Sequence, residues 1–206
     1  LSIGSKRLRN SSTHTRRLVL VPGFGDTPLS WLGVLTMLSP VLGKHFDEVV
    51  LLDFPGFSGF LAQERSFHSM DLMMNAVDDV FDSLSPDTIL GHSLGGWLTA
   101  KYAARCGRGE RPSVQKRHGY RGPRAVILAS PSGAHASPEA RGEWERMFRS
   151  FIDDGYHAIR PHLFAKEPKW FRLIEKEFGK FAGKEDIRLF TESVTESHLV
   201  QHELGD

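Results

Sequence analysis

The stretch that decides the fold is Thr88-Ile89-Leu90-Gly91-His92-Ser93-Leu94-Gly95-Gly96. It opens with a short apolar run of the kind found in buried strands, and residues 94–105 have the composition of a helix. Between the two, Gly91 to Gly95 fits the pattern G-x-S-x-G. A serine at such a strand-to-helix junction sits on a sharp turn that exposes its hydroxyl, and the two glycines let strand and helix approach closely. We therefore predict that Ser93 is a nucleophile at the carboxyl edge of a sheet.

The chain on both sides of this stretch alternates short apolar runs with longer amphipathic stretches. Further strands are expected at 18–21, 49–52 and 125–129, and further helices at 29–42 and 69–84. Continuous apolar strands joined by helical crossovers imply a mainly parallel sheet with helices on both faces, so the predicted fold class is α/β.

The predicted helix at 69–84 is amphipathic. Its apolar residues recur at steps of three and four, and carboxylates occupy the other side. We expect that other side to be solvated; its members are Asp78, Asp79 and Asp82.

The pattern changes from Ser137 onward. Strand-like runs vanish, and residues 137–206 are charged, aromatic and helical in period. Aromatic side chains at such spacing usually form a core between helices. We therefore divide the chain into a basic segment at 1–17, an incomplete α/β core at 18–136 and a helical segment at 137–206.

Two loops add to the predicted site. Pro22-Gly23-Phe24-Gly25 follows the first strand, where a serine-nucleophile site of this type draws one donor for a developing oxyanion. The other donor is the amide after the nucleophile, so the predicted pair is the backbone N–H groups of Phe24 and Leu94. The run from Asp53 to Ser58 forms a turn after the second strand.

Together these residues resemble the α/β-hydrolase superfamily, whose members often read "HGFG", "D-x-P-G-x-G-x-S" and "GHSxGG" in this order. The resemblance covers residues 18 to about 133 and implies that residues 137–206 are a helical cap or lid. Within that segment, residues 160–164 and 199–204 look most like the monoacylglycerol-lipase-like branch. The implied activity is that of a serine hydrolase acting on carboxylic esters, lipid-like ones such as a monoacylglycerol, through an acyl-enzyme on Ser93. Neither a cofactor nor a metal is implied.

The resemblance has two departures. Pro22 stands where the family usually has histidine, which should change the support of the loop more than its chemistry. The triad should follow the chain order Ser, Asp or Glu, His. We expect both remaining members beyond residue 206, so that residues 1–206 alone would be inactive. No triad role is assigned to His45, His68, His92, His135, His157, His162, His198 or His202, and His135 is expected to line the mouth of the site.

The amino-acid composition limits the classes of binding partner that are expected. Net charge is +1, and the apolar and charged fractions of 40% and 25% are ordinary for a globular protein. Two basic stretches, at 6–17 and 105–124, lack interleaved aromatic residues apart from Tyr120, so no nucleic-acid partner is expected. No apolar run approaches the ~20 residues that span a bilayer. We expect a small-molecule ester or lipid substrate and a cytoplasmic location, with contact to a membrane surface left open.

Alternatives remain at this point. Serine rather than aspartate at the turn disfavours dehalogenase and epoxide-hydrolase chemistry and suits acyl transfer. Hydrolysis of an amide or of a C–C bond would use the same residues. A hydrolase fold can also serve as a non-catalytic binding or scaffold protein, because fold does not fix function.

Overall fold

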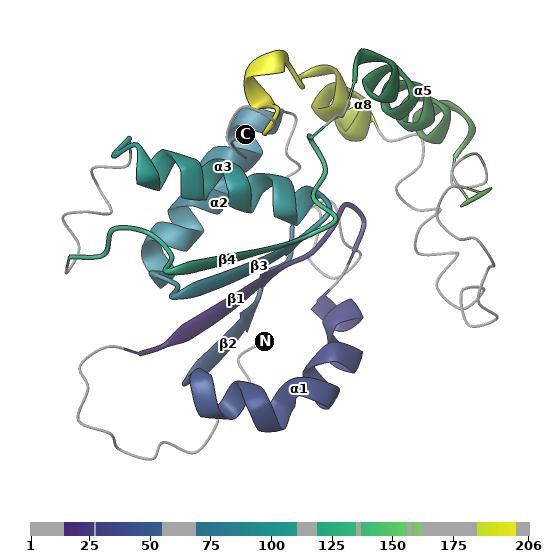
Figure 1. Ribbon diagram of the computed structural model, residues 1–206. Coiled ribbons are helices and arrows are strands. Elements are labelled where there is room, and N and C mark those ends of the chain that lie inside the picture. Colours follow the sequence, from purple (N-terminus) through teal and green to yellow (C-terminus); the bar gives the residue numbers. More distant parts are fainter. Residues whose placement is uncertain are drawn as a thin grey trace.

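A computed structural model of the chain describes residues 15–26, 28–54, 69–110, 119–134, 137–155, 158, 160, 161 and 185–200. Four strands form one sheet in the order β2-β1-β3-β4, and every neighbouring pair is parallel (Figure 1). The strands are β1 (Arg17–Val21), β2 (Glu48–Leu51), β3 (Thr88–His92) and β4 (Ala125–Ala129). The predicted parallel sheet is confirmed.

Helices cover both faces of this sheet. The described helices are η1 (Pro28–Trp31), α1 (Leu32–His45), α2 (Met70–Leu84), α3 (Leu94–Gly107), α5 (Pro138–Asp154), α8 (Glu185–Glu192) and η3 (Glu196–His198). Figure 1 shows α1 on one face, α2 and α3 on the other, and α5 and α8 beyond the carboxyl ends of the strands. In the part of the chain that the structure describes, no helix is long and apolar enough to cross a membrane.

The central strand β1 explains why both faces are covered. Side chains of a strand point alternately to its two sides. Val19 and Val21 join the core cluster under α2 and α3, whereas Leu18 and Leu20 join the cluster around Trp31 on the α1 side. All four side chains are at most 4% exposed. The uninterrupted apolar run at 18–21 therefore reflects burial on both faces.

The helix starts follow local capping chemistry. Oγ of Ser69 accepts a hydrogen bond from the Leu72 amide at the start of α2, at 3.3 Å. Oγ of Ser137 does the same for the Ala140 amide at the start of α5, at 3.2 Å. A serine in this position satisfies one of the amides that a helix leaves without an internal partner. At the carboxyl end of α1, Gly43 still lies inside the helix. The chain stays helical up to His45, and the Phe46 amide donates to the Leu42 carbonyl at 2.8 Å.

The expectation of a solvated acidic side of α2 is wrong for two of its three carboxylates. Asp79 is exposed, but Asp78 and Asp82 are only 1% and 9% exposed. Asp78 forms an ion pair with Arg105 at 2.5 Å, and Asp82 accepts a hydrogen bond from the Tyr102 hydroxyl at 3.0 Å. Burial raises the pKa of the Tyr102 hydroxyl, which stays a donor. Both partners are on α3, so this side of α2 packs against a neighbouring helix.

Candidate active site

Ser93 is the single residue between β3 and α3. Its backbone has φ 50° and ψ −116°. Residues other than glycine rarely adopt this conformation, which costs about 1–3 kcal/mol. Three backbone hydrogen bonds of 3.0 Å hold it there. The Ser93 amide donates to the Ala129 carbonyl, and the Ser93 carbonyl accepts from the amides of Trp97 and Ser132. The turn is thus fixed from the sheet and from the helix at once.

Glycine is required on both sides of this turn. A Cβ added to Gly91 would lie 2.4 Å from the Gly95 carbonyl oxygen. A Cβ added to Gly95 would lie 2.4 Å from the carbonyl oxygen of Pro22 and 2.5 Å from that of Val21. No real Cβ contact is that short, so β3, α3 and the end of β1 pack backbone against backbone. This close approach positions Ser93 at the carboxyl edge of the sheet.

The loop after β1 lies against the same turn. A Cβ added to Gly23 would lie 3.2 Å from Cβ of Ser93. Phe24 and Gly25 follow and line a cavity together with Ser93 and Leu94. Leu94 is the first residue of α3, and an amide at that position has no partner within the helix. The structure therefore brings together the three residues predicted for the nucleophile and the oxyanion donors.

The cavity above Ser93 has a volume of about 280 Å³ among the described residues. Its walls are mainly aromatic and come from the β1 loop, α3, α5 and the end of α8. The polar side chains that line it are Ser93, Ser132 and Thr191. The remaining lining side chains are apolar or aromatic, namely Phe24, Leu94, Trp97, Trp144, Met147, Phe148, Phe151, Phe190 and Val194. Such a surface is suited to an apolar ligand.

A chain of ring contacts links α5 to the walls of the site. The rings of Phe24 and Phe148 meet edge to face with centroids 5.5 Å apart, and Phe24 meets Phe151 at 5.9 Å. Trp144 lies 4.5 Å from Phe148 and 6.3 Å from Trp97 on α3. Contacts of this geometry contribute about 0.5–1.5 kcal/mol each beyond the area they bury. They hold α5 beside the loop that carries Phe24 and beside the helix that begins after Ser93.

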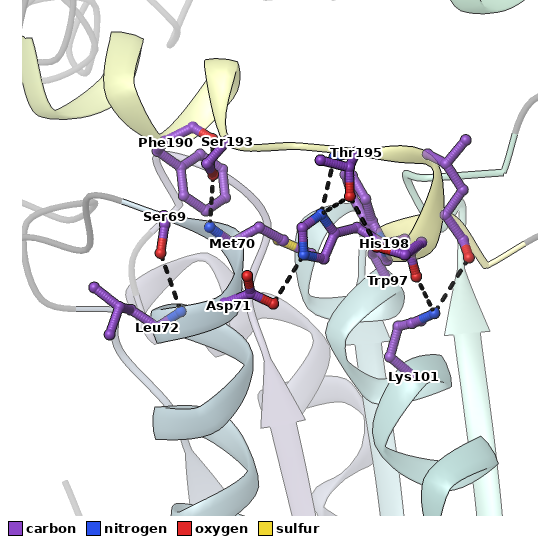
Figure 2. Close-up of polar contacts among 12 residues, drawn as sticks. Ser69, Met70, Asp71, Leu72, Trp97, Lys101, Phe190, Ser193, Thr195 and His198 are labelled. Carbon is purple, nitrogen blue, oxygen red and sulfur yellow. Dashed lines mark hydrogen bonds and ion pairs between the residues drawn. The ribbon is translucent and has the colours of Figure 1, made fainter.

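Residues 193–200, which we call the strap, tie α8 to the core (Figure 2). The Ser193 hydroxyl accepts from the Met70 amide at 2.8 Å. Nε1 of Trp97 donates to the His198 carbonyl at 2.6 Å, and Nζ of Lys101 donates to the Ser197 carbonyl at 2.8 Å. Trp97 thus lines the cavity with its ring and anchors the strap with its nitrogen.

His198 is the buried polar side chain of the strap, at 5% exposure. Its Nδ1 accepts from the Thr195 amide at 2.9 Å, so the proton of the neutral ring is on Nε2, which lies 2.9 Å from Oδ1 of Asp71 (Figure 2). The ring therefore bridges the strap to the start of α2. This arrangement gives His198 a structural role.

Comparison with known proteins assigns the chain to a family. A sequence model described as the alpha/beta hydrolase family matches residues 18–198. The chain belongs to the alpha/beta hydrolase family. The superfamily inferred from the sequence motifs is thereby confirmed. No curated protein gives a significant match to the chain.

Solved structures of low sequence identity share the alpha/beta hydrolase fold. An enol-lactonase from Burkholderia xenovorans LB400 is 20% identical with a TM-score of 0.62, over 94% of this chain and 70% of the other. The RedJ thioesterase of the prodiginine pathway in Streptomyces coelicolor is 18% identical with a TM-score of 0.56, over 92% and 71%. A carboxylesterase of Nitrososphaera gargenis is 17% identical with a TM-score of 0.53, over 95% and 67%.

The histidines of this alpha/beta hydrolase do not complete a triad among the described residues. No described histidine is hydrogen-bonded to Oγ of Ser93. Nδ1 of His92 lies 3.5 Å from Oδ2 of Asp26, and the ring packs on Gly23. His45 is the last residue of α1. The other histidines lie outside the described residues, namely His14, His68, His118, His135, His157, His162 and His202.

Ser132 also belongs to the site, although no sequence motif pointed to it. Oγ of Ser132 lies 3.0 Å from Oγ of Ser93, and both line the cavity. Ser132 follows β4, which pairs with β3 so that Ala129 lies opposite His92. The carboxyl ends of parallel neighbours meet at one edge of the sheet, so the serines in Ser130-Pro131-Ser132 could have been placed near Ser93 once this pairing was assumed.

Proposed function

We propose that the protein is a serine hydrolase of carboxylic esters that works through an acyl-enzyme on Ser93. The observation that carries this proposal is the strained backbone of Ser93 between β3 and α3, at the floor of an apolar cavity. A strain of this kind persists only where the surrounding structure enforces it, and it is concentrated at functional sites. Membership of the alpha/beta hydrolase family supports hydrolytic chemistry.

In the proposed reaction, Oγ of Ser93 attacks the ester carbonyl carbon while its proton passes to a general base. The carbonyl oxygen becomes an oxyanion, and the amides of Phe24 and Leu94 donate to it. Collapse of this intermediate breaks the bond to the alcohol, which leaves with the proton taken up by the base. Water then attacks the acyl group on Ser93 by the same route and releases the acid. The base and its acidic partner are not assigned to a described residue.

The proposed substrate is an ester with a medium or long acyl chain, lipid-like as in a monoacylglycerol. The cavity walls from α5 and α8 are apolar, and the described lining offers only hydroxyl groups as polar side chains. We propose that these two helices belong to a cap that contacts the acyl chain. The ring contacts of Trp144 and Phe148 hold α5 in that position.

Acyl-chain preference tests the substrate proposal. We expect kcat/KM of the full-length protein to rise by about 30-fold from p-nitrophenyl acetate to the butyrate, because the butyrate has two more methylenes and each contributes about 1 kcal/mol or more in an apolar pocket. Phe148→Ala should flatten this rise, whereas Met37→Ala on α1, where the side chain is 81% exposed, should leave it unchanged. If kcat/KM of the unsubstituted protein did not change with acyl-chain length, the lipid-like substrate would be contradicted, whereas ester hydrolysis itself would not.

The oxyanion donors can be tested at Leu94. Leu94→Pro removes the amide proton, and we expect kcat to fall by about 10²–10³-fold, as for other lost oxyanion donors. Leu94→Ala keeps the amide and should retain much more activity per folded molecule. Leu94 is only 4% exposed, so either substitution also affects stability. Thermal unfolding of both variants therefore measures the folded fraction. Equal kcat in the two folded variants would argue against this donor.

A further inference from the structure

The hydroxyl of Ser132 is hydrogen-bonded to the proposed nucleophile. Oγ of Ser132 lies 3.0 Å from Oγ of Ser93, and the Ser132 amide donates to the Ser93 carbonyl, also at 3.0 Å. Two residues that are 39 positions apart in the chain are thus joined through both backbone and side chain. Among the described residues, Ser132 supplies the side-chain hydrogen bond to Oγ of Ser93.

The loop that carries Ser132 is built tightly around Ser93. The Ala129 carbonyl accepts a hydrogen bond from the Ser93 amide, and three residues later the Ser132 amide donates one to the Ser93 carbonyl. Ser130, in between, has φ 45°, a conformation unfavourable for a residue other than glycine. Gly133 has φ 76°, and a Cβ added there would lie 2.3 Å from the Trp97 ring. The position of the Ser132 hydroxyl is therefore set by a loop with little freedom to move.

Few other polar side chains surround the hydroxyls of Ser93 and Ser132 in the described part of the cavity. Apart from Ser93, Ser132 and Thr191, the described lining of the cavity is apolar or aromatic. The indole nitrogen of Trp97 already donates to the His198 carbonyl. A serine side chain has three staggered rotamers, and a hydrogen bond in an apolar cavity favours the one that makes it.

We propose that Ser132 is a positioning residue for the nucleophile, an inference that rests on the proposed role of Ser93. Its hydroxyl holds the Ser93 side chain in the attacking rotamer. It also donates to Oγ of Ser93 while the proton of that oxygen leaves for the base. A hydrogen bond to an oxygen that gains negative charge strengthens as the charge develops. The effect is therefore on the rate of attack, and the binding of the reagent or substrate is unaffected.

A matched pair of variants isolates the hydroxyl. Ser132→Thr and Ser132→Val have nearly the same shape, but only threonine keeps the hydroxyl. The measurement is the inactivation of the full-length protein by an alkyl fluorophosphonate, resolved into the maximal rate kinact and the half-saturating concentration KI. We expect Ser132→Val to lower kinact by about 10- to 100-fold, as for a lost hydrogen bond to a charged group, with KI within about twofold. Ser132→Thr should restore most of kinact.

Ser132→Ala guards against a misfolded valine variant, and it should show the same loss of kinact as Ser132→Val. Equal kinact for Ser132→Thr and the variants without a hydroxyl would overturn the positioning role and leave Ser93 as the nucleophile. A loss confined to KI would overturn it as well. Failure of the unsubstituted protein to react at Ser93 would overturn both this inference and the proposed function.

Discussion

Replacing Ser93 with alanine should abolish ester turnover of the full-length protein, with kcat lowered by about 10⁶-fold. The reason is that the covalent step has no other described nucleophile in the same strained turn, where three backbone hydrogen bonds direct the side chain to the cavity. What remains should be the small rate advantage of substrate binding and of the oxyanion donors. The measurement is the steady-state rate with an acyl ester.

The matched control for this change is Ser39→Ala. Ser39 is an exposed serine on α1 whose hydroxyl donates to the Thr36 carbonyl at 3.2 Å, so its loss should leave kcat unchanged. Thermal unfolding of Ser93→Ala should be close to that of the unsubstituted protein, because alanine keeps Cβ and the backbone bonds. A Ser93→Ala protein that is folded and retains ordinary turnover would refute the assigned nucleophile.

Gly95→Ala should have the largest effect on stability. The new Cβ would lie 2.4 Å and 2.5 Å from two backbone carbonyl oxygens at the end of β1, so relief requires moving the central strand or α3. We expect the free energy of unfolding to fall by about 3 kcal/mol or more, which exceeds the usual cost of a single substitution. Urea unfolding of the full-length protein measures this change.

Gly107→Ala is the control on the same helix. Gly107 is the last residue of α3, and nothing lies within 4 Å of an added Cβ. Alanine has the higher helix propensity, so stability should stay the same or rise by up to about 1 kcal/mol. Similar unfolding midpoints for the Gly95→Ala and Gly107→Ala proteins would contradict the close packing of strand, turn and helix.

Local sequence patterns were sufficient to predict the sheet and the turn at Ser93. The apolar runs at 18–21 and 125–129 became parallel neighbours of β3. Burial on both faces explains the uninterrupted apolar run at 18–21, whereas Ile127 on β4 is 49% exposed. Gly91 and Gly95 could be interpreted from the motif because the cause of their presence, backbone contact, acts within a few residues of Ser93. Phe24, Ser93 and Leu94 each lie just after the carboxyl end of a strand, and the loops that follow parallel strands meet at one edge of the sheet.

Features that depend on the neighbouring element could not be predicted in the same way. The carboxylates of Asp78 and Asp82 looked solvated because helix periodicity cannot show that Arg105 and Tyr102 lie opposite them. The contact of Ser132 with Ser93 spans 39 residues and depends on the register between β3 and β4. The structural bond of His198 to Asp71 likewise joins segments 127 positions apart.

The central claim, that Ser93 is the nucleophile, is tested most directly by locating a covalent adduct. The full-length protein is treated with an alkyl fluorophosphonate, digested and analysed by mass spectrometry. The account predicts an adduct on the peptide that contains Ser93 and no adduct in the Ser93→Ala protein. An adduct on another residue, including Ser132, or labelling that survives in the Ser93→Ala protein would contradict it.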